Sequence, residues 1–74
     1  GQIRVAFNLA QPISVDMIVY SIVGEQIINI PERNFQAGKH SIDLNTDSFP
    51  GGIYLLKINI GRKGISKKLI ITSQ

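Results

Sequence analysis

Apolar and polar residues alternate most clearly in residues 53–60 of this chain. Four apolar side chains are each separated by one residue: Tyr54, Leu56, Ile58 and Ile60. Because side chains of a β-strand alternate between its two faces, all four share one face. The opposite face is apolar at its start and polar at its end: Ile53, Leu55, Lys57 and Asn59. The pattern predicts a central strand that is buried on one face and half-covered on the other.

A turn signal comes directly before this strand, in Phe49-Pro50-Gly51-Gly52. Proline at the second position of a turn sets φ to about −65°, and a following glycine supplies the positive φ of a type II turn. We therefore expect a type II turn in which Gly51 has the positive φ.

The same alternation predicts five further strands, at residues 3–9, 13–20, 25–30, 39–44 and 65–72. Pro31 is expected to end the third of them, followed by a polar connection over residues 32–38. In the fourth, Ile42 and Leu44 should face inward together with the aliphatic part of His40. Helical spacing is absent, and six short strands separated by turn signals indicate an all-β sandwich or barrel.

Turn-forming residues are expected to connect consecutive strands at two places. Residues 21–24 are expected to form a tight turn, because Ser21 can hydrogen-bond to the backbone and Gly24 suits a left-handed conformation. A four-residue hairpin loop is expected at residues 61–64, Gly-Arg-Lys-Gly.

Composition limits the chain to one small domain. It has 74 residues, of which 43% are hydrophobic, and no cysteine, so neither disulfides nor a thiolate metal site can stabilise the fold. No apolar run approaches the length of a transmembrane helix, and no signal peptide is present. The sequence starts at Gly1, just before the first predicted strand, which suggests a fragment of a longer protein.

The sequence offers little for catalysis or for cofactor binding. His40 is the only histidine, so a nucleophile–base pair would need a serine beside it, and its neighbourhood is ordinary strand-entry sequence. Residues 43–47, Asp-Leu-Asn-Thr-Asp, alternate oxygen ligands as a calcium loop does. However, Ser48 stands where the glycine of that loop belongs and Tyr54 where its glutamate belongs. We expect no enzyme activity, no metal and no cofactor.

Charge is distributed unevenly along the chain. The net charge is +3, and all five acidic residues precede Phe49. Five basic residues then follow without an acid: Lys57, Arg62, Lys63, Lys67 and Lys68. Tyr54 is the only aromatic residue near this cluster and is expected in the core, so there is no stacking platform for nucleic acid. The cluster either keeps an edge of the sheet soluble or contributes to recognition by a partner.

Four stretches, in this order, resemble the C-terminal sorting domain of the type IX secretion system (Por secretion system). They are residues 18–27, 36–40, 49–58 and 67–71. The family's motif and turn positions fall on five residues: Gly24, Gly38, Gly52, Tyr54 and Lys57. Two features depart from the family pattern. Ser21 replaces the usual aspartate, and the Pro-Asn-Pro-like segment that usually precedes the first strand is not in this sequence.

This resemblance implies an Ig-like antiparallel β-sandwich of about six to seven short strands, with residues 1–74 forming a single C-terminal sorting domain. It implies a non-catalytic signal that directs an N-terminal cargo protein through the type IX translocon. A sortase-like outer-membrane protease would then remove it. The protein would pass through the periplasm and reach the outer membrane, the cell surface or the medium. The residues expected to be recognised close the chain: Lys67, Lys68, Leu69, Ile70 and Ile71.

Two other functions remain open at this stage. One is a structural Ig-like module similar to those of flagellar-hook-capping proteins. The other is an adhesion or carbohydrate-binding sandwich, which would need exposed aromatic residues, whereas most of the five aromatics fall on inward positions. No nucleic-acid partner is expected, and the edge strands could allow self-association.

Overall fold

A computed structural model describes residues 1–47 and 49–72; Ser48, Ser73 and Gln74 lie outside the described residues. The structure contains six β-strands and, within the described part, no helix. The strands are β1 (Gln2–Leu9), β2 (Ile13–Ser21), β3 (Gln26–Phe35), β4 (Gly38–Asn45), β5 (Gly52–Ile60) and β6 (Lys63–Ile71). The predicted all-β class is confirmed. In the described residues there is no helix long and apolar enough to cross a membrane.

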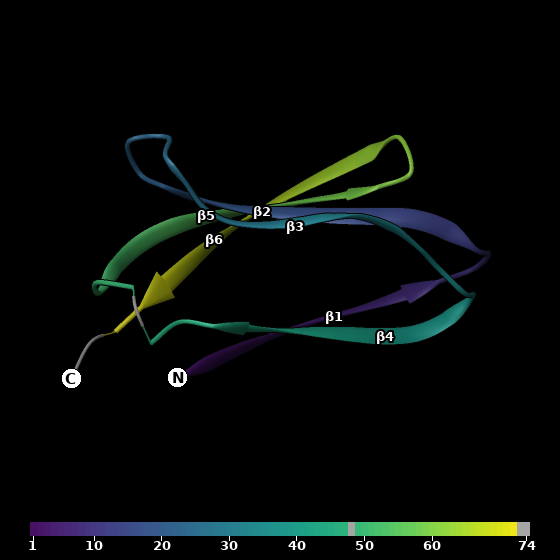
Figure 1. The fold of residues 1–74 in the computed structure, drawn as a ribbon, viewed down its shortest axis with the longest axis horizontal. Coiled ribbons are helices and arrows are strands. Elements are labelled where there is room, and N and C mark those ends of the chain that lie inside the picture. The colour runs from purple at the N-terminus through teal and green to yellow at the C-terminus, as the bar shows by residue number, and fades with distance from the viewer. Residues whose placement is uncertain (48, 73–74) are drawn as a thin grey trace.

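The strands form two antiparallel sheets of unequal width, stacked as a small β-sandwich (Figure 1). The smaller sheet pairs β1 with β4, and the larger sheet has the order β3-β2-β5-β6. β3 and β6 are therefore the edges of the larger sheet, and β5 is internal, as the sequence predicted. Because two strands face four, the smaller sheet cannot cover the whole inner face of the larger one.

The core lies where the two sheets overlap, and β2 is its most buried strand. Met17 is 0% exposed, and Val15 and Val19 are each 1% exposed. The other buried side chains come from four strands, β1, β3, β4 and β5: Val5, Leu9, Phe35, Leu44, Tyr54, Leu56 and Ile58. β6 contributes no fully buried side chain among its described residues.

Strand β5 has a buried inner face and a more exposed outer face, as predicted. Tyr54 is buried, and its hydroxyl donates a hydrogen bond of 2.6 Å to the carbonyl of Pro50. Ile53 and Leu55 on the opposite face are 49% and 43% exposed. This face is thus about half-covered, as predicted, because the smaller sheet packs against the other side.

The turn between β2 and β3 has the predicted chemistry. The Ser21 hydroxyl accepts a 3.2 Å hydrogen bond from the Glu25 amide, and the Gly24 amide donates to the Ser21 carbonyl at 3.0 Å. Gly24 has φ of 90°, which a side chain would disfavour. Before β5 the prediction is wrong in detail, since the positive φ occurs at Gly52 and not at Gly51.

Pro31 does not end the third strand. β3 continues to Phe35, and its pairing with β2 shifts register between Val15 and Met17, which face Arg33 and Ile30. This bulge accommodates the missing amide of proline because β3 is an edge strand, with one row of backbone groups left unpaired. The second hairpin also differs: β6 begins at Lys63, so the turn between β5 and β6 is shorter than predicted.

Aromatic side chains close one end of the sandwich. The His40 ring stacks on Phe7, with centroids 5.6 Å apart, and meets the edge of Phe35 at 5.1 Å. The imidazole ring of His40 therefore packs inward as well as its aliphatic part, which was all that the sequence predicted. Phe35 was assigned to a polar connection, but it is buried at the end of β3.

Candidate recognition strand

Strand β6 contains all five residues expected to be recognised, and it is an edge strand. It pairs only with β5, through a continuous register that runs from Gly52–Ile71 to Ile60–Lys63. Its other edge therefore presents backbone N–H and C=O groups that no strand of the described chain pairs with. Such an edge can accept a further strand.

Side chains along β6 alternate between two faces of the sheet, so the five residues are divided between these faces. Lys67, Leu69 and Ile71 lie opposite Leu56, Tyr54 and Gly52 of β5. Cross-strand partners share a face, and Leu56 and Tyr54 are core residues, so these three belong to the inner face. Lys68 and Ile70 belong to the outer face. The structure thus separates the two consecutive lysines, which the sequence hypothesis treated as one motif.

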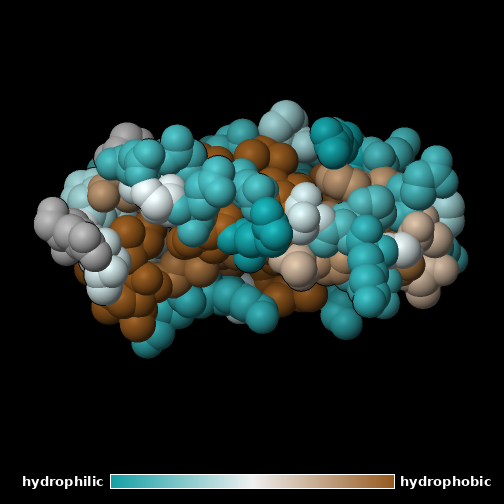
Figure 2. All heavy atoms as spheres, turned by 90° about the horizontal axis from the view of Figure 1, so that it is seen from below, coloured by the Kyte–Doolittle hydropathy of each residue, from teal (hydrophilic) through white to brown (hydrophobic). Residues whose placement is uncertain are grey.

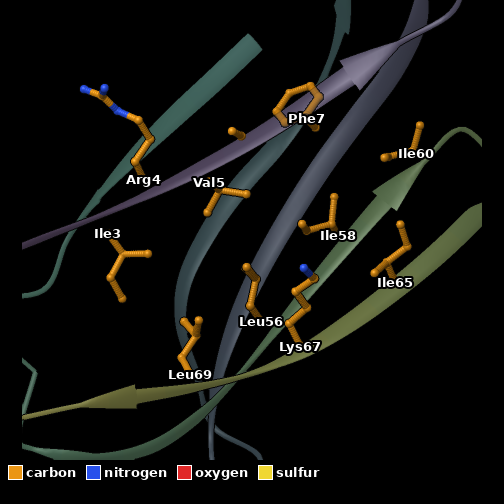
Figure 3. Close-up of a pocket in the computed structure, with 11 residues that line it drawn as sticks. Ile3, Arg4, Val5, Phe7, Leu56, Ile58, Ile60, Ile65, Lys67 and Leu69 are labelled. Atoms are coloured by element: carbon orange, nitrogen blue, oxygen red, sulfur yellow. The ribbon is translucent and has the colours of Figure 1, made fainter. Parts of the chain in front are cut away.

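The inner face of β6 borders an open groove of about 300 Å³ (Figure 3). The opposite wall is β1, and β5 forms the floor between them. Ile65 and Leu69 are half-buried here, whereas Lys67 is exposed. In a view from the β1–β4 side, apolar surface is visible between hydrophilic side chains along the molecule (Figure 2).

The outer face of β6 joins a separate apolar surface. Ile70 is 69% exposed and lies opposite Ile53, while Lys68 lies opposite Leu55. Six large hydrophobic residues are exposed in the described chain, and all occur near the end of the larger sheet where β2 and β6 finish and β5 begins: Ile22, Val23, Ile27, Ile53, Leu55 and Ile70. Lys68 is thus a cation within an apolar surface.

The charges around β6 are mostly unpaired. Among the described residues, no lysine forms a salt bridge with another described residue, and one ion pair between two side chains joins Arg4 Nε to Asp43 Oδ1 at 2.9 Å. The hydrogen bond from Arg4 and, to a smaller extent, the positive charge of Arg4 lower the pKa of Asp43. The same hydrogen bond and the negative charge of Asp43 raise the pKa of Arg4. Arg4 is at the rim of the groove but is engaged by this carboxylate. Lys67 is therefore the available cation inside the groove.

The other family positions lie in one turn, in β4 and in β5. Gly24 is in the turn between β2 and β3, Gly38 is the first residue of β4, and Gly52 lies opposite Ile71 of β6. Tyr54 is in the core, and Lys57 is on the outer face opposite Ser66. These residues do not form a cluster with Lys67. Gly52, Tyr54 and Lys57 belong to β5, the strand that pairs with β6, whereas Gly24 and Gly38 lie outside this hairpin.

The residues considered for catalysis or metal binding have local structural partners. His40 Nε2 is 2.7 Å from the Gln36 carbonyl oxygen, and its ring packs against two phenylalanines. Asn45 Oδ1 accepts a 2.9 Å hydrogen bond from the Asp47 amide, as in a turn, and Asp43 pairs with Arg4. No group of three or more metal-ligating side chains occurs within residues 1–47 and 49–72.

The sequence matches the family model described as "Secretion system C-terminal sorting domain" over residues 1–72. The chain belongs to this family. It is a non-catalytic secretion signal for cargo proteins, which selects one of the three functions left open by the sequence. Its family implies interaction with the type IX secretion machinery and passage of the cargo across the outer membrane. Comparisons with curated proteins and with solved structures find no match.

Sequence reasoning did not find the whole surface that this sorting domain presents. It singled out β6 but not the residues of β1 that face it, Ile3 and Val5, nor Ile65 at the start of the inner face. The alternation Ile65-x-Lys67-x-Leu69 was a usable signal, since it places one cation between two apolar residues on one face. The position of β1 depends on sheet pairing, for which the sequence has no local signal.

Proposed function

We propose that the type IX translocon recognises this sorting domain through β6, and that residues 1–74 act as the C-terminal address of a longer cargo protein. A sortase-like outer-membrane protease then removes the domain and leaves the cargo on the cell surface or in the medium. One observation supports this role most strongly: β6 has an unpaired edge and accessible side chains on both faces.

An unpaired edge strand offers two physical means of recognition. Backbone groups of a partner strand can pair with it, which gives affinity with little dependence on sequence. Side chains then provide specificity, and here they include Lys67 and Lys68, both exposed on opposite faces. A partner that contacts both lysines must surround the strand or insert it into an acidic cavity, because a flat surface reaches only one face.

Export of a reporter tests the address function. Residues 1–74 are attached to the C-terminus of a fluorescent protein with a signal peptide, in a bacterium that has the type IX machinery. We expect the reporter to reach the surface or the medium only when the translocon is intact. Accumulation in the periplasm of a cell that exports its own cargo would contradict the proposal.

Point variants test the part played by β6 without removing a strand. Reversing both charges, Lys67→Glu with Lys68→Glu, should hold the reporter in the periplasm. Lys39→Glu is the matched control, because Lys39 is also an exposed lysine on a strand but belongs to β4 in the other sheet. Equal export of the reporter with either change would show that β6 is not recognised through its charges.

Deletion of residues 67–74 is a harsher test of the same strand. It removes most of the pairing with β5 and should also stop export. Circular dichroism of the purified variant separates loss of recognition from loss of the fold.

Removal of the domain has its own readout. Mass spectrometry of the exported reporter should show that the sorting domain has been cut off, and inactivating the protease should leave it attached. An exported reporter that retains the domain in cells with an active protease would contradict the cleavage step.

A further inference from the structure

The groove between β1 and β6 is the least complete part of the sandwich. β1 pairs with β4 on one side only, and the lining of the groove comes from β1, β5 and β6 without a residue of β4. β4 therefore lies on the far side of β1, and the free edge of β1 faces the space above β6 (Figure 3). Two half-buried residues of β6, Ile65 and Leu69, lie beneath this space.

The dimensions of sheets indicate what fits there. Neighbouring strands lie about 4.8 Å apart, and stacked sheets lie about 10 Å apart. A strand added to the free edge of β1 would extend the smaller sheet by one position and lie above β6. It would satisfy the backbone groups of β1 and bury the inner side chains of β6. A helix has no free row of backbone groups and could not do both.

The inner face of β6 indicates the side chains of this strand. Ile65, Lys67 and Leu69 occur at every second position, and only Lys67 is charged. A strand above them presents its own side chains at every second position. Complementarity then requires an apolar residue, an acidic residue and an apolar residue, each separated by one position. The acid would meet Lys67, since Arg4 at the rim is already paired with Asp43.

We propose that this groove binds an extended segment of a partner protein, which pairs with the free edge of β1 and places an acidic side chain, between two apolar ones, opposite Lys67. Resting on the proposed sorting function, we assign this segment to the secretion machinery. Lys67 contacts the bound segment inside the groove, whereas Lys68 on the outer face does not contribute to binding in the groove.

A peptide titration tests the groove apart from export. The probe is an acetylated and amidated peptide, SVTVTETVTVS, in which valines and the central glutamate occupy one face. Binding to the ¹⁵N-labelled chain should shift the amide signals of β1 together with those of β6. Shifts in β6 without β1 would mean pairing with the other edge of β6 and would overturn the proposal, as would absence of binding up to about 1 mM peptide.

Charge variants test the contact with Lys67. A peptide with glutamine in place of glutamate should bind about fivefold more weakly to the natural chain. Lys67→Gln should abolish this preference, and Lys68→Gln should leave it unchanged because its side chain is on the outer face. If both substitutions reduced the preference for glutamate equally, the peptide's acid would be responding to the net charge of the chain and not to Lys67 in the groove.

Backbone pairing is tested with two methylated peptides. One is N-methylated at its valines and glutamate, the other at the intervening residues. Amides of a strand point alternately to its two edges, so one peptide should lose binding and the other should keep it. Loss of binding by both, or by neither, would exclude pairing along one edge.

Two other occupants give distinct results. If the chain alone sediments as a dimer whose dissociation shifts the β1 signals, the occupant is a second copy. If the cargo-linked protein no longer binds the peptide at β1, the occupant is a segment of the cargo. Either result overturns the assignment to a partner protein, while the export test of the sorting function would be unaffected.

Discussion

Strands β2 and β6 belong to the same sheet but have very different surroundings. The inner side chains of β2 are at most 1% exposed at Val15, Met17 and Val19, whereas those of β6 are half-buried or exposed. Both strands show alternation, and both contain apolar residues on the inner face. The difference comes from the width of the opposing sheet, because two strands can cover only part of four. The most buried side chains are thereby placed on β2, whereas the strand for which we propose recognition is β6.

The largest expected effect contrasts one buried side chain with one half-buried side chain. Met17→Ala should lower the free energy of unfolding by about 2–5 kcal/mol, because it opens a cavity in the fully covered part of the core. Leu69→Ala on β6 should cost only about 1 kcal/mol, since much of its surface is already in contact with water. Urea denaturation measures both; similar losses would show that β6 is covered after all.

The next effect compares the two hairpin turns. Gly61 has φ of 59°, and a Cβ there would lie 2.6 Å from Ile13 Cδ1, whereas a Cβ on Gly24, with φ of 90°, would have open space. Gly61→Ala should therefore destabilise by about 2 kcal/mol and Gly24→Ala by about 1 kcal/mol. Thermal unfolding of the two variants gives the difference. The reverse order would mean that Ile13 moves aside at no cost.

A smaller effect is expected from the hydroxyl of Tyr54, which lies at the covered side of β5. Tyr54→Phe removes its hydrogen bond to the Pro50 carbonyl and should cost about 1 kcal/mol. The ring remains in the core, so the near-ultraviolet signal of a packed fold should persist. Denaturation of the variant alongside the natural chain measures the loss. An unchanged midpoint would show that water replaces this bond fully.

The smallest effect concerns the ion pair at the rim of the groove. Arg4 lowers the pKa of Asp43 in the folded chain, so the pair stabilises the fold above the ordinary pKa of aspartate and loses this contribution as pH falls through the lower folded value. Both side chains are well exposed, so the effect should be slight. Asp43→Asn should flatten the fall in stability below about pH 4. An identical pH profile for variant and natural chain would contradict this.

Much of the fold could be predicted from alternation, since side-chain period and turn residues are local properties. The inner face of β5 and the turn formed by Ser21 and Gly24 were predicted correctly for this reason. Pro31 was misjudged because a proline in an edge strand needs only a bulge, and the sequence does not show which strand is an edge.

The groove was not predictable for a related reason. The pairing of β1 with β4 joins residues 29 to 43 positions apart, from Leu9–Gly38 to Gln2–Asn45, and it determines which edge of β1 stays free. The alternation of residues along β6 predicts the face on which Lys67 lies. It does not predict that β1 lies across the groove from Lys67. The family resemblance led us to predict residues 67–71 as the recognised segment, and the structure divides these residues between two faces of β6.

The incomplete covering of β6 also affects how the domain opens. A strand held by one neighbour and by no fully buried side chain separates from the fold at a lower free energy than a central strand does. Amide hydrogens that bond β6 to β5 should therefore exchange with solvent faster than those that bond β2 to β5. The strand that we propose as the recognised signal is thus the one that can separate from its neighbour while the rest of the domain stays folded.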